Sequence, residues 1–81
     1  MEQKVRDLLE AAFPGIIMDT EVLSDERISG TVIWAGFEGQ DHVDRQTMIR
    51  TMLREKLGDD AQCVGVLLTY TPEEMDAMNA A

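Results

Sequence analysis

The amino-acid sequence predicts an α+β fold with the element order α-β-β-α-β-α, in which helices cover one face of a three-stranded sheet. Three observations lead to this prediction. Two segments with helical spacing of apolar residues enclose a pair of β-branched segments that a short turn joins. A third apolar segment follows the longer helix, and a strong helix start comes directly after it. The 81 residues are expected to form one domain, residues 1–81.

The first helix is expected over residues 2–13. Apolar residues recur there at helical spacing, which gives the helix one apolar face: Val5, Leu8, Leu9 and Ala12. Pro14 ends the helix, because proline disfavours helical geometry in the residue before it.

Two strands follow, over residues 16–23 and 27–35. The second is rich in β-branched and aromatic residues, as strands are. Residues 24–26 form a short turn, so the two strands are expected to pair as an antiparallel hairpin. Gly30 inside the second strand predicts a bulge or a close approach of another backbone segment.

The longest helix is expected to begin after Asp41, a good N-cap with Asp44 three residues on, and to run to about residue 57. Gly58 stands where a glycine commonly ends a helix. The apolar stripe of this helix is expected to face the sheet: Met48, Ile49, Met52, Leu53 and Leu57.

The third strand is expected over residues 61–70. It is apolar at successive positions, which predicts that both of its faces are covered. A parallel or mixed pairing is allowed, because the helix before it is long enough for a crossover. Thr71, Pro72 and Glu74 then start a short last helix as N-cap, first position and third position.

The net charge of the chain limits the kinds of partner that it can bind. Sixteen acidic and seven basic residues give a formal charge of −9, which repels a phosphate backbone. No apolar run approaches the ~20 residues that span a bilayer, so we expect no membrane insertion. A single cysteine fits a reducing compartment, and we expect a cytoplasmic location.

Four basic residues fall in the long helix and form either a solvated helix face or a docking strip: Arg45, Arg50, Arg54 and Lys56.

Signatures of an enzyme are weak, and we expect a protein without catalytic activity. His42, the single histidine, falls in the first turn of the long helix, with no nucleophile beside it. Cys63 admits three interpretations: a core residue, a metal ligand or a reactive thiol. One cysteine and one histidine cannot complete a tetrahedral zinc site in a monomer, so a metal would need ligands from a partner.

Residues 36–39, Gly-Phe-Glu-Gly, have the spacing G-x-x-G, which in KH domains clamps a nucleic-acid backbone. The alternative is a turn with two permissive glycines. If the motif and the basic helix act together, the residues that contact a partner or a nucleic acid are Gly36, Phe37, Gly39, Arg45, Arg50 and Arg54.

These motifs together resemble the BolA family. The resemblance is carried by residues 37–39 and 43–45, by the long helix after them, and by the apolar strand that ends in residues 69–74, Thr-Tyr-Thr-Pro-Glu-Glu. It implies a type II KH-like fold and a small non-enzymatic protein that docks a monothiol glutaredoxin. It also implies that the chain can share a [2Fe–2S] cluster with that partner, in iron–sulfur or iron-linked regulation. The alternative function is that of a DNA-binding transcriptional regulator.

The chain departs from the BolA pattern at three positions. Gln46 stands where the family has a histidine, and Cys63 occupies the position of a histidine that serves as a cluster ligand. The short connection of residues 24–27 carries neither the histidine nor the cysteine that supplies the second ligand. We therefore expect a monomer without a cofactor in isolation, with Cys63 as a metal ligand only in a complex.

Overall fold

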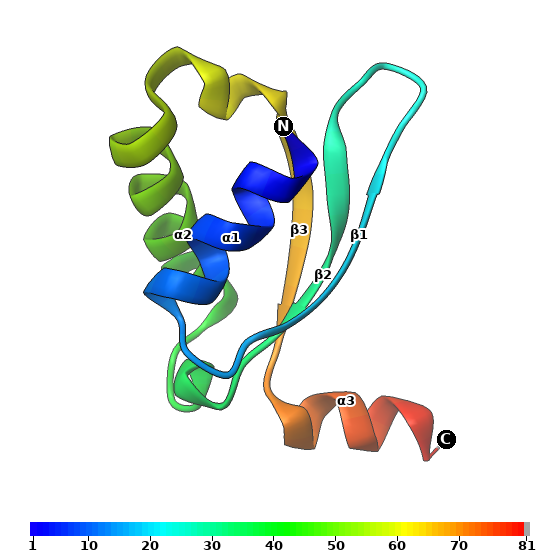
Figure 1. Cartoon of the computed structure of the whole chain (residues 1–81). Coiled ribbons are helices and arrows are strands. Elements are labelled where there is room, and N and C mark those ends of the chain that lie inside the picture. Colours follow the sequence, from blue (N-terminus) through cyan, green and yellow to red (C-terminus); the bar gives the residue numbers. More distant parts are fainter. Residues whose placement is uncertain (81) are drawn as a thin grey trace.

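The computed structural model describes residues 1–80, and it confirms the α+β fold and the order of its elements (Figure 1). The predicted single domain covers residues 1–81, and its last residue, 81, lies outside the described part of the chain. Within the described part, no helix is both long and apolar enough to cross a membrane. The elements are α1 (Glu2–Ala12), β1 (Ile17–Val22), β2 (Ile28–Ile33), the 3₁₀ turn η1 (Ala35–Phe37), α2 (His42–Leu57), the 3₁₀ segment η2 (Gly58–Cys63), β3 (Val64–Tyr70) and α3 (Pro72–Asn79).

The sheet has the strand order β1-β2-β3 and is mixed. Strands β1 and β2 form the predicted antiparallel hairpin, whereas β2 and β3 run parallel because α2 carries the chain back between them. Helices α1 and α2 lie together against one face, which we call the inner face, and α3 projects from the end of β3 away from both of them (Figure 1).

Gly30 confirms both expectations drawn from its place in a strand. The register between β2 and β3 shifts between Ile28 and Gly30, which is the predicted irregularity. A Cβ atom on Gly30 would lie 2.1 Å from the carbonyl oxygen of Asp19 and 2.7 Å from the Cα atom of Thr20. Only glycine therefore lets the backbone of β1 come this close.

The hydrophobic core lies between the inner face of the sheet and the two long helices. Its buried residues come from α1, β2, η1, α2 and β3 and from the connection between α1 and β1: Val5, Leu9, Phe13, Ile16, Ile28, Val32, Phe37, Ile49, Leu53, Leu57 and Leu67. Trp34 is half-buried at the margin of this core, with its ring centroid 5.0 Å from that of Phe13 and its indole N–H donating to the carbonyl oxygen of Pro14 at 3.0 Å.

The predicted helix ends are confirmed. The carboxylate of Asp41 accepts a hydrogen bond of 2.8 Å from the backbone N–H of Asp44. Gly58 ends α2 with a φ of 59°, a conformation that glycine adopts at little cost. Thr71 and Glu74 form a complete capping box at the start of α3, where Pro72 takes the first helical position.

Two expectations about the third strand are wrong. The strand begins at Val64 rather than at residue 61, because η2, with six residues from Gly58 to Cys63, continues the helical path after α2. Nor are both faces of β3 covered. Leu67 and Thr69 are buried under α2, whereas Val66 and Leu68 point to the opposite, outer face and are exposed. The continuous apolar run thus reflects one buried face and one apolar face that no helix of the fold covers.

Candidate functional site

A groove runs between α2 and β3 and ends at η2. Its volume is about 460 Å³. The floor is apolar and is formed by three buried residues, Ile49 and Leu53 from α2 and Leu67 from β3. Since these are core residues, the groove reaches down to the core and can accept apolar side chains.

One wall of the groove carries two arginines. Arg50 and Arg54 are exposed and stand one helical turn apart, so they lie on the same side of α2. The ion pairs formed within residues 1–80 join Arg27 to Asp25 and Arg45 to Glu74, so they leave both groove arginines out. The guanidinium groups of Arg50 and Arg54 are therefore available to carboxylates of a partner.

Two side chains of α2 close part of the free edge of β3. The amide nitrogen of Gln46 donates to the carbonyl oxygen of Leu67, and Nη1 of Arg45 donates to that of Thr69 at 3.2 Å. An open strand edge invites pairing with another chain, and these two contacts occupy its acceptors. Gln46, which replaces the histidine of the BolA pattern, thus has a structural partner of its own.

Arg45 does not belong to the exposed strip that the sequence suggested. Its side chain is only 5% exposed, its Nε donates to the carbonyl oxygen of Gln40 at 2.9 Å, and its Nη1 lies 2.7 Å from a carboxylate oxygen of Glu74. Its guanidinium carbon also lies 5.6 Å from the centroid of the Phe37 ring. Arg45 therefore connects α2 to β3 and α3 within the chain, and the expectation that it contacts a partner is wrong.

The contact with Arg45 changes the pKa of Glu74. The hydrogen bond from Arg45 lowers the pKa of the Glu74 carboxyl to about 2, and the N–H of Thr71, which donates to Oε1 at 2.8 Å, acts in the same direction. Sequence reasoning assigned Glu74 a cap only. Its second role depends on a residue 29 positions earlier, for which the sequence carries no local signal.

The Gly-Phe-Glu-Gly turn is built for packing. Phe37 is fully buried, so the expectation that it contacts a nucleic acid or a partner is corrected. A Cβ atom on Gly36 would lie 2.4 Å from the Trp34 ring, so this glycine makes room for the indole. Gly39 is exposed and has a φ of 82°. The alternative interpretation, a turn with two permissive glycines, accounts for these positions. Phe37 and Arg45 are buried and therefore do not support the interpretation as a nucleic-acid contact.

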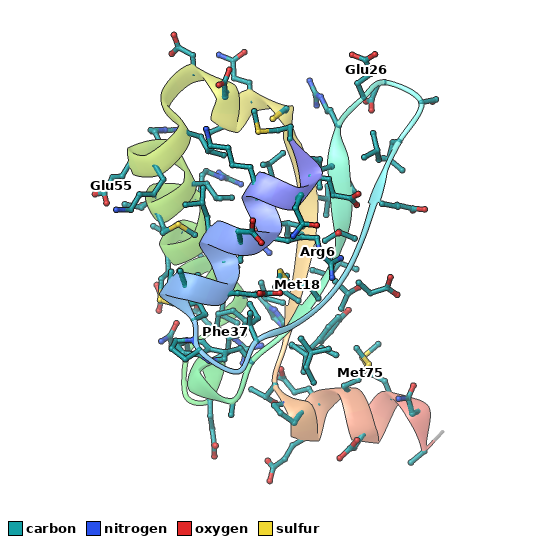
Figure 2. The ribbon with its side chains drawn as sticks, viewed as in Figure 1. Arg6, Met18, Glu26, Phe37, Glu55 and Met75 are labelled. Carbon is teal, nitrogen blue, oxygen red and sulfur yellow. The ribbon has the colours of Figure 1, made fainter. Side chains whose placement is uncertain are left out.

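Cys63 is the last residue of η2 and lies beside a second, shallower depression. This depression has a volume of about 650 Å³ and lies between η2, the start of α1 and the tip of the β1–β2 hairpin. Glu26 marks that tip, at the same end of the molecule as η2 (Figure 2). Asp59 and Gln62 line both this depression and the groove, so the two adjoin across η2. We call the groove and the depression together the η2 face.

The residues around Cys63 do not form a metal centre by themselves. The thiol is half-buried and donates to the carbonyl oxygen of Asp60. The hairpin tip brings Asp25, Glu26 and Arg27 to the depression, but neither histidine nor cysteine. In residues 1–80, no group of three or more His, Cys, Asp or Glu side chains is arranged to hold a metal ion.

His42 and Cys63 are not brought together. His42 is exposed in the first turn of α2, with its ring centroid 6.5 Å from that of Tyr70. Cys63 follows the far end of that helix, whose 16 residues span roughly 24 Å at ~1.5 Å per residue. Asp59 and Gln62 are the residues of the η2 face that sequence reasoning missed, because the path of η2 after Gly58 places them there.

No protein-family model matches the sequence, and no curated protein sequence matches it either. The structure is similar to BolA1 from Arabidopsis thaliana, with a TM-score of 0.70 and 22% identity over 89% of this chain and 92% of that one. It is similar to the BolA domain of SufE1 from Arabidopsis thaliana, with a TM-score of 0.72 and 18% identity over 89% and 92%. A bol-like protein from Babesia bovis gives a TM-score of 0.67 and 15% identity over 98% and 93%. These likenesses show that the chain has the BolA fold.

Proposed function

We propose that this chain, which has the BolA fold, is a divergent BolA-type adaptor that docks a monothiol glutaredoxin-type protein on its η2 face. The observation that supports this proposal most is the junction of the groove and the Cys63 depression at Asp59 and Gln62. One continuous surface thereby combines an apolar floor, two cationic side chains and a thiol. Apolar contacts with a charged rim are what a protein partner needs.

The proposed partner contact does not depend on a metal. Cys63 is the one thiol that the chain offers on the η2 face, and a [2Fe–2S] cluster is held by several thiolate or imidazole ligands. A shared cluster would therefore take its other ligands from the partner. We accordingly assign the affinity of the complex to the groove, and we assign Cys63 to any cluster that the complex holds. The proposed role is adaptation or regulation without catalysis, in a reducing cytoplasm.

The test mixes the purified chain with a monothiol glutaredoxin under anaerobic conditions, once without metal and once with iron and sulfide. Size-exclusion chromatography with light scattering measures the mass of the complex, and visible absorbance reports a cluster. We expect a heterodimer in both mixtures. If neither mixture gives a complex, the proposal is wrong.

Cys63→Ser separates the two parts of the proposal. The substitution removes the thiol but keeps a small polar side chain, so we expect the metal-free complex to form as with the unmodified chain. If the unmodified mixture shows cluster absorbance, we expect Cys63→Ser to reduce it. Cluster absorbance that stays unchanged would remove the role assigned to Cys63 and leave the docking proposal standing.

A further inference from the structure

The outer face of the sheet carries a row of apolar side chains. Ile17 pairs with Ile33, and Ile33 pairs with Tyr70, so the three side chains form one row across all three strands. In the next outward-facing row, Thr31 lies between Asp19 and Leu68. Successive side chains of a strand point to opposite faces, so these rows stand opposite the inward-facing row of Met18, Val32 and Thr69, in which Met18 is half-buried and the other two are buried.

Several of these side chains are open to solvent. Ile17 is 62% exposed, Val66 65% and Leu68 47%. They come from the two edge strands and thus span the width of the sheet. Scattered single apolar residues are ordinary on a protein surface, but a connected group of this kind marks an interaction surface.

Helix α3 extends the apolar surface beyond the end of β3. It begins directly after Tyr70, and its methionines Met75 and Met78 stand three residues apart, on one side of the helix. The side chain of Met75 rises from α3 toward the sheet, on the side away from α1 and α2 (Figure 2). Methionine side chains are flexible and adapt to the shape of a partner. We call the outer rows of the sheet and these two methionines the outer face.

The strands and the helix that form the outer face carry charge of one sign only. Strands β1, β2 and β3 and helix α3 contain neither lysine nor arginine. They carry the exposed carboxylates of Asp19, Glu21, Glu73 and Asp76. A second copy of the chain would therefore set carboxylates against carboxylates, which costs free energy at an interface. A partner with basic side chains is complementary to this surface.

We propose that the outer face binds an amphipathic helix of a partner protein, with apolar side chains over Ile17, Ile33 and Leu68 and lysines or arginines toward the acidic rim. The form of the partner follows from the sheet, because a sheet face is commonly covered by helices, as α1 and α2 cover the inner face here. The outer face is distinct from the η2 face, where the exposed charges beside the groove include Arg50 and Arg54. The groove wall of Arg50 and Arg54 and the acidic rim of the outer face thus have opposite charge.

The test uses a synthetic helical peptide with leucines on one side and lysines on the other. Two further peptides serve as controls: one with glutamates in place of the lysines, and one in which the same leucines and lysines are scrambled so that they no longer form two sides. Amide chemical shifts of the chain locate the binding site during titration. We expect the first peptide to shift resonances of β1, β3 and α3, the others to bind at least about tenfold more weakly, and the affinity to fall with added salt.

Matched substitutions test the surface itself. Val66→Lys places a charge of the partner's sign on the outer face, and we expect peptide binding about tenfold weaker. Val43→Lys is the control, because Val43 is 72% exposed on α2, away from the outer face, and should leave the affinity unchanged. Thermal unfolding checks that both variants fold. Val66→Lys should also leave the metal-free glutaredoxin complex intact, which separates this proposal from the one above.

Four results would overturn the proposal. These are an absence of binding, binding that the scrambled or glutamate peptide reproduces, shifts confined to the η2 face, and equal weakening by both substitutions. Sedimentation velocity adds a fifth. If the chain alone forms a dimer that Val66→Lys dissociates, a second copy occupies the outer face instead of a basic helix.

Discussion

Arg45 and Glu74 join the first turn of α2 to the first turn of α3, with Nη1 of Arg45 2.7 Å from Oε1 of Glu74. The same carboxylate oxygen accepts the N–H of Thr71, so one side chain caps α3 and pairs with α2. Helix α3 contributes no buried residue to the core. The contact with Arg45 is therefore the main polar attachment of α3 to the helices on the inner face.

Acid should weaken the fold through Glu74. The pKa of this carboxyl is about 2 in the folded chain against an ordinary value of 4.5, so the folded state favours the ionised form. The resulting stabilisation is present above about pH 4.5 and is lost as the pH falls toward 2. We expect Glu74→Gln to flatten the decline of the free energy of unfolding in this range, as measured by urea denaturation. Glu73→Gln, next to it and without an ion pair, should keep the decline of the unmodified chain. Equal slopes for all three proteins would contradict the assignment.

Arg45→Met should destabilise the chain by about 2–4 kcal/mol, because it leaves the carbonyl oxygens of Gln40 and Thr69 without their donor and Glu74 without its pair. Arg50→Met, an exposed position on the same helix, should change the free energy of unfolding by at most about 0.5 kcal/mol. Arg45→Lys should recover only part of the loss, since lysine lacks the planar fork that reaches several acceptors. Chemical denaturation measures all three, and a loss at Arg50 equal to that at Arg45 would show that burial is not the cause.

Gly30→Ala tests the close approach of β1 to β2. The added Cβ would meet the backbone of Asp19 and Thr20, which cannot move without separating the strands, so we expect a loss of about 3 kcal/mol. Gly39→Ala is the control. Its Cβ would meet nothing within 4 Å, and only the positive φ opposes it, at a cost of about 1 kcal/mol. If both variants lose the same free energy of unfolding, the close backbone contact at Gly30 adds nothing to the cost of the substitution.

The sequence predicted the parts of the fold that depend on local chemistry. Asp41, Gly58 and Thr71 act through neighbours within a few residues, so their patterns are readable without knowledge of the fold. Gly30 was readable because a glycine inside a strand is unusual enough to need a reason. The resemblance to the BolA family added the global arrangement, which the structure then confirmed.

The errors concern burial, which depends on contacts distant in sequence. A basic residue in a helix gives the same pattern whether it faces water or the interior. Arg45 is buried because Glu74 and Thr69, far along the chain, come to meet it. In the same way, the apolar sequence of β3 does not state which of its faces a helix covers. Val66 and Leu68 stay exposed because α3 turns away from the sheet instead of packing over them.

The last prediction concerns the groove arginines. Arg50→Glu and Arg54→Glu should each weaken the metal-free complex with a monothiol glutaredoxin by about tenfold, because each variant places a carboxylate where we propose that a carboxylate of the partner binds. Lys4→Glu changes the net charge by the same amount at an exposed position of α1 that does not line the groove, and it should leave the affinity within about twofold. Isothermal titration calorimetry at low and high salt measures the affinities, and the differences should shrink at high salt. Equal weakening by all three substitutions would show that only the net charge matters, and the docking site would then have to be sought elsewhere than in the groove between α2 and β3.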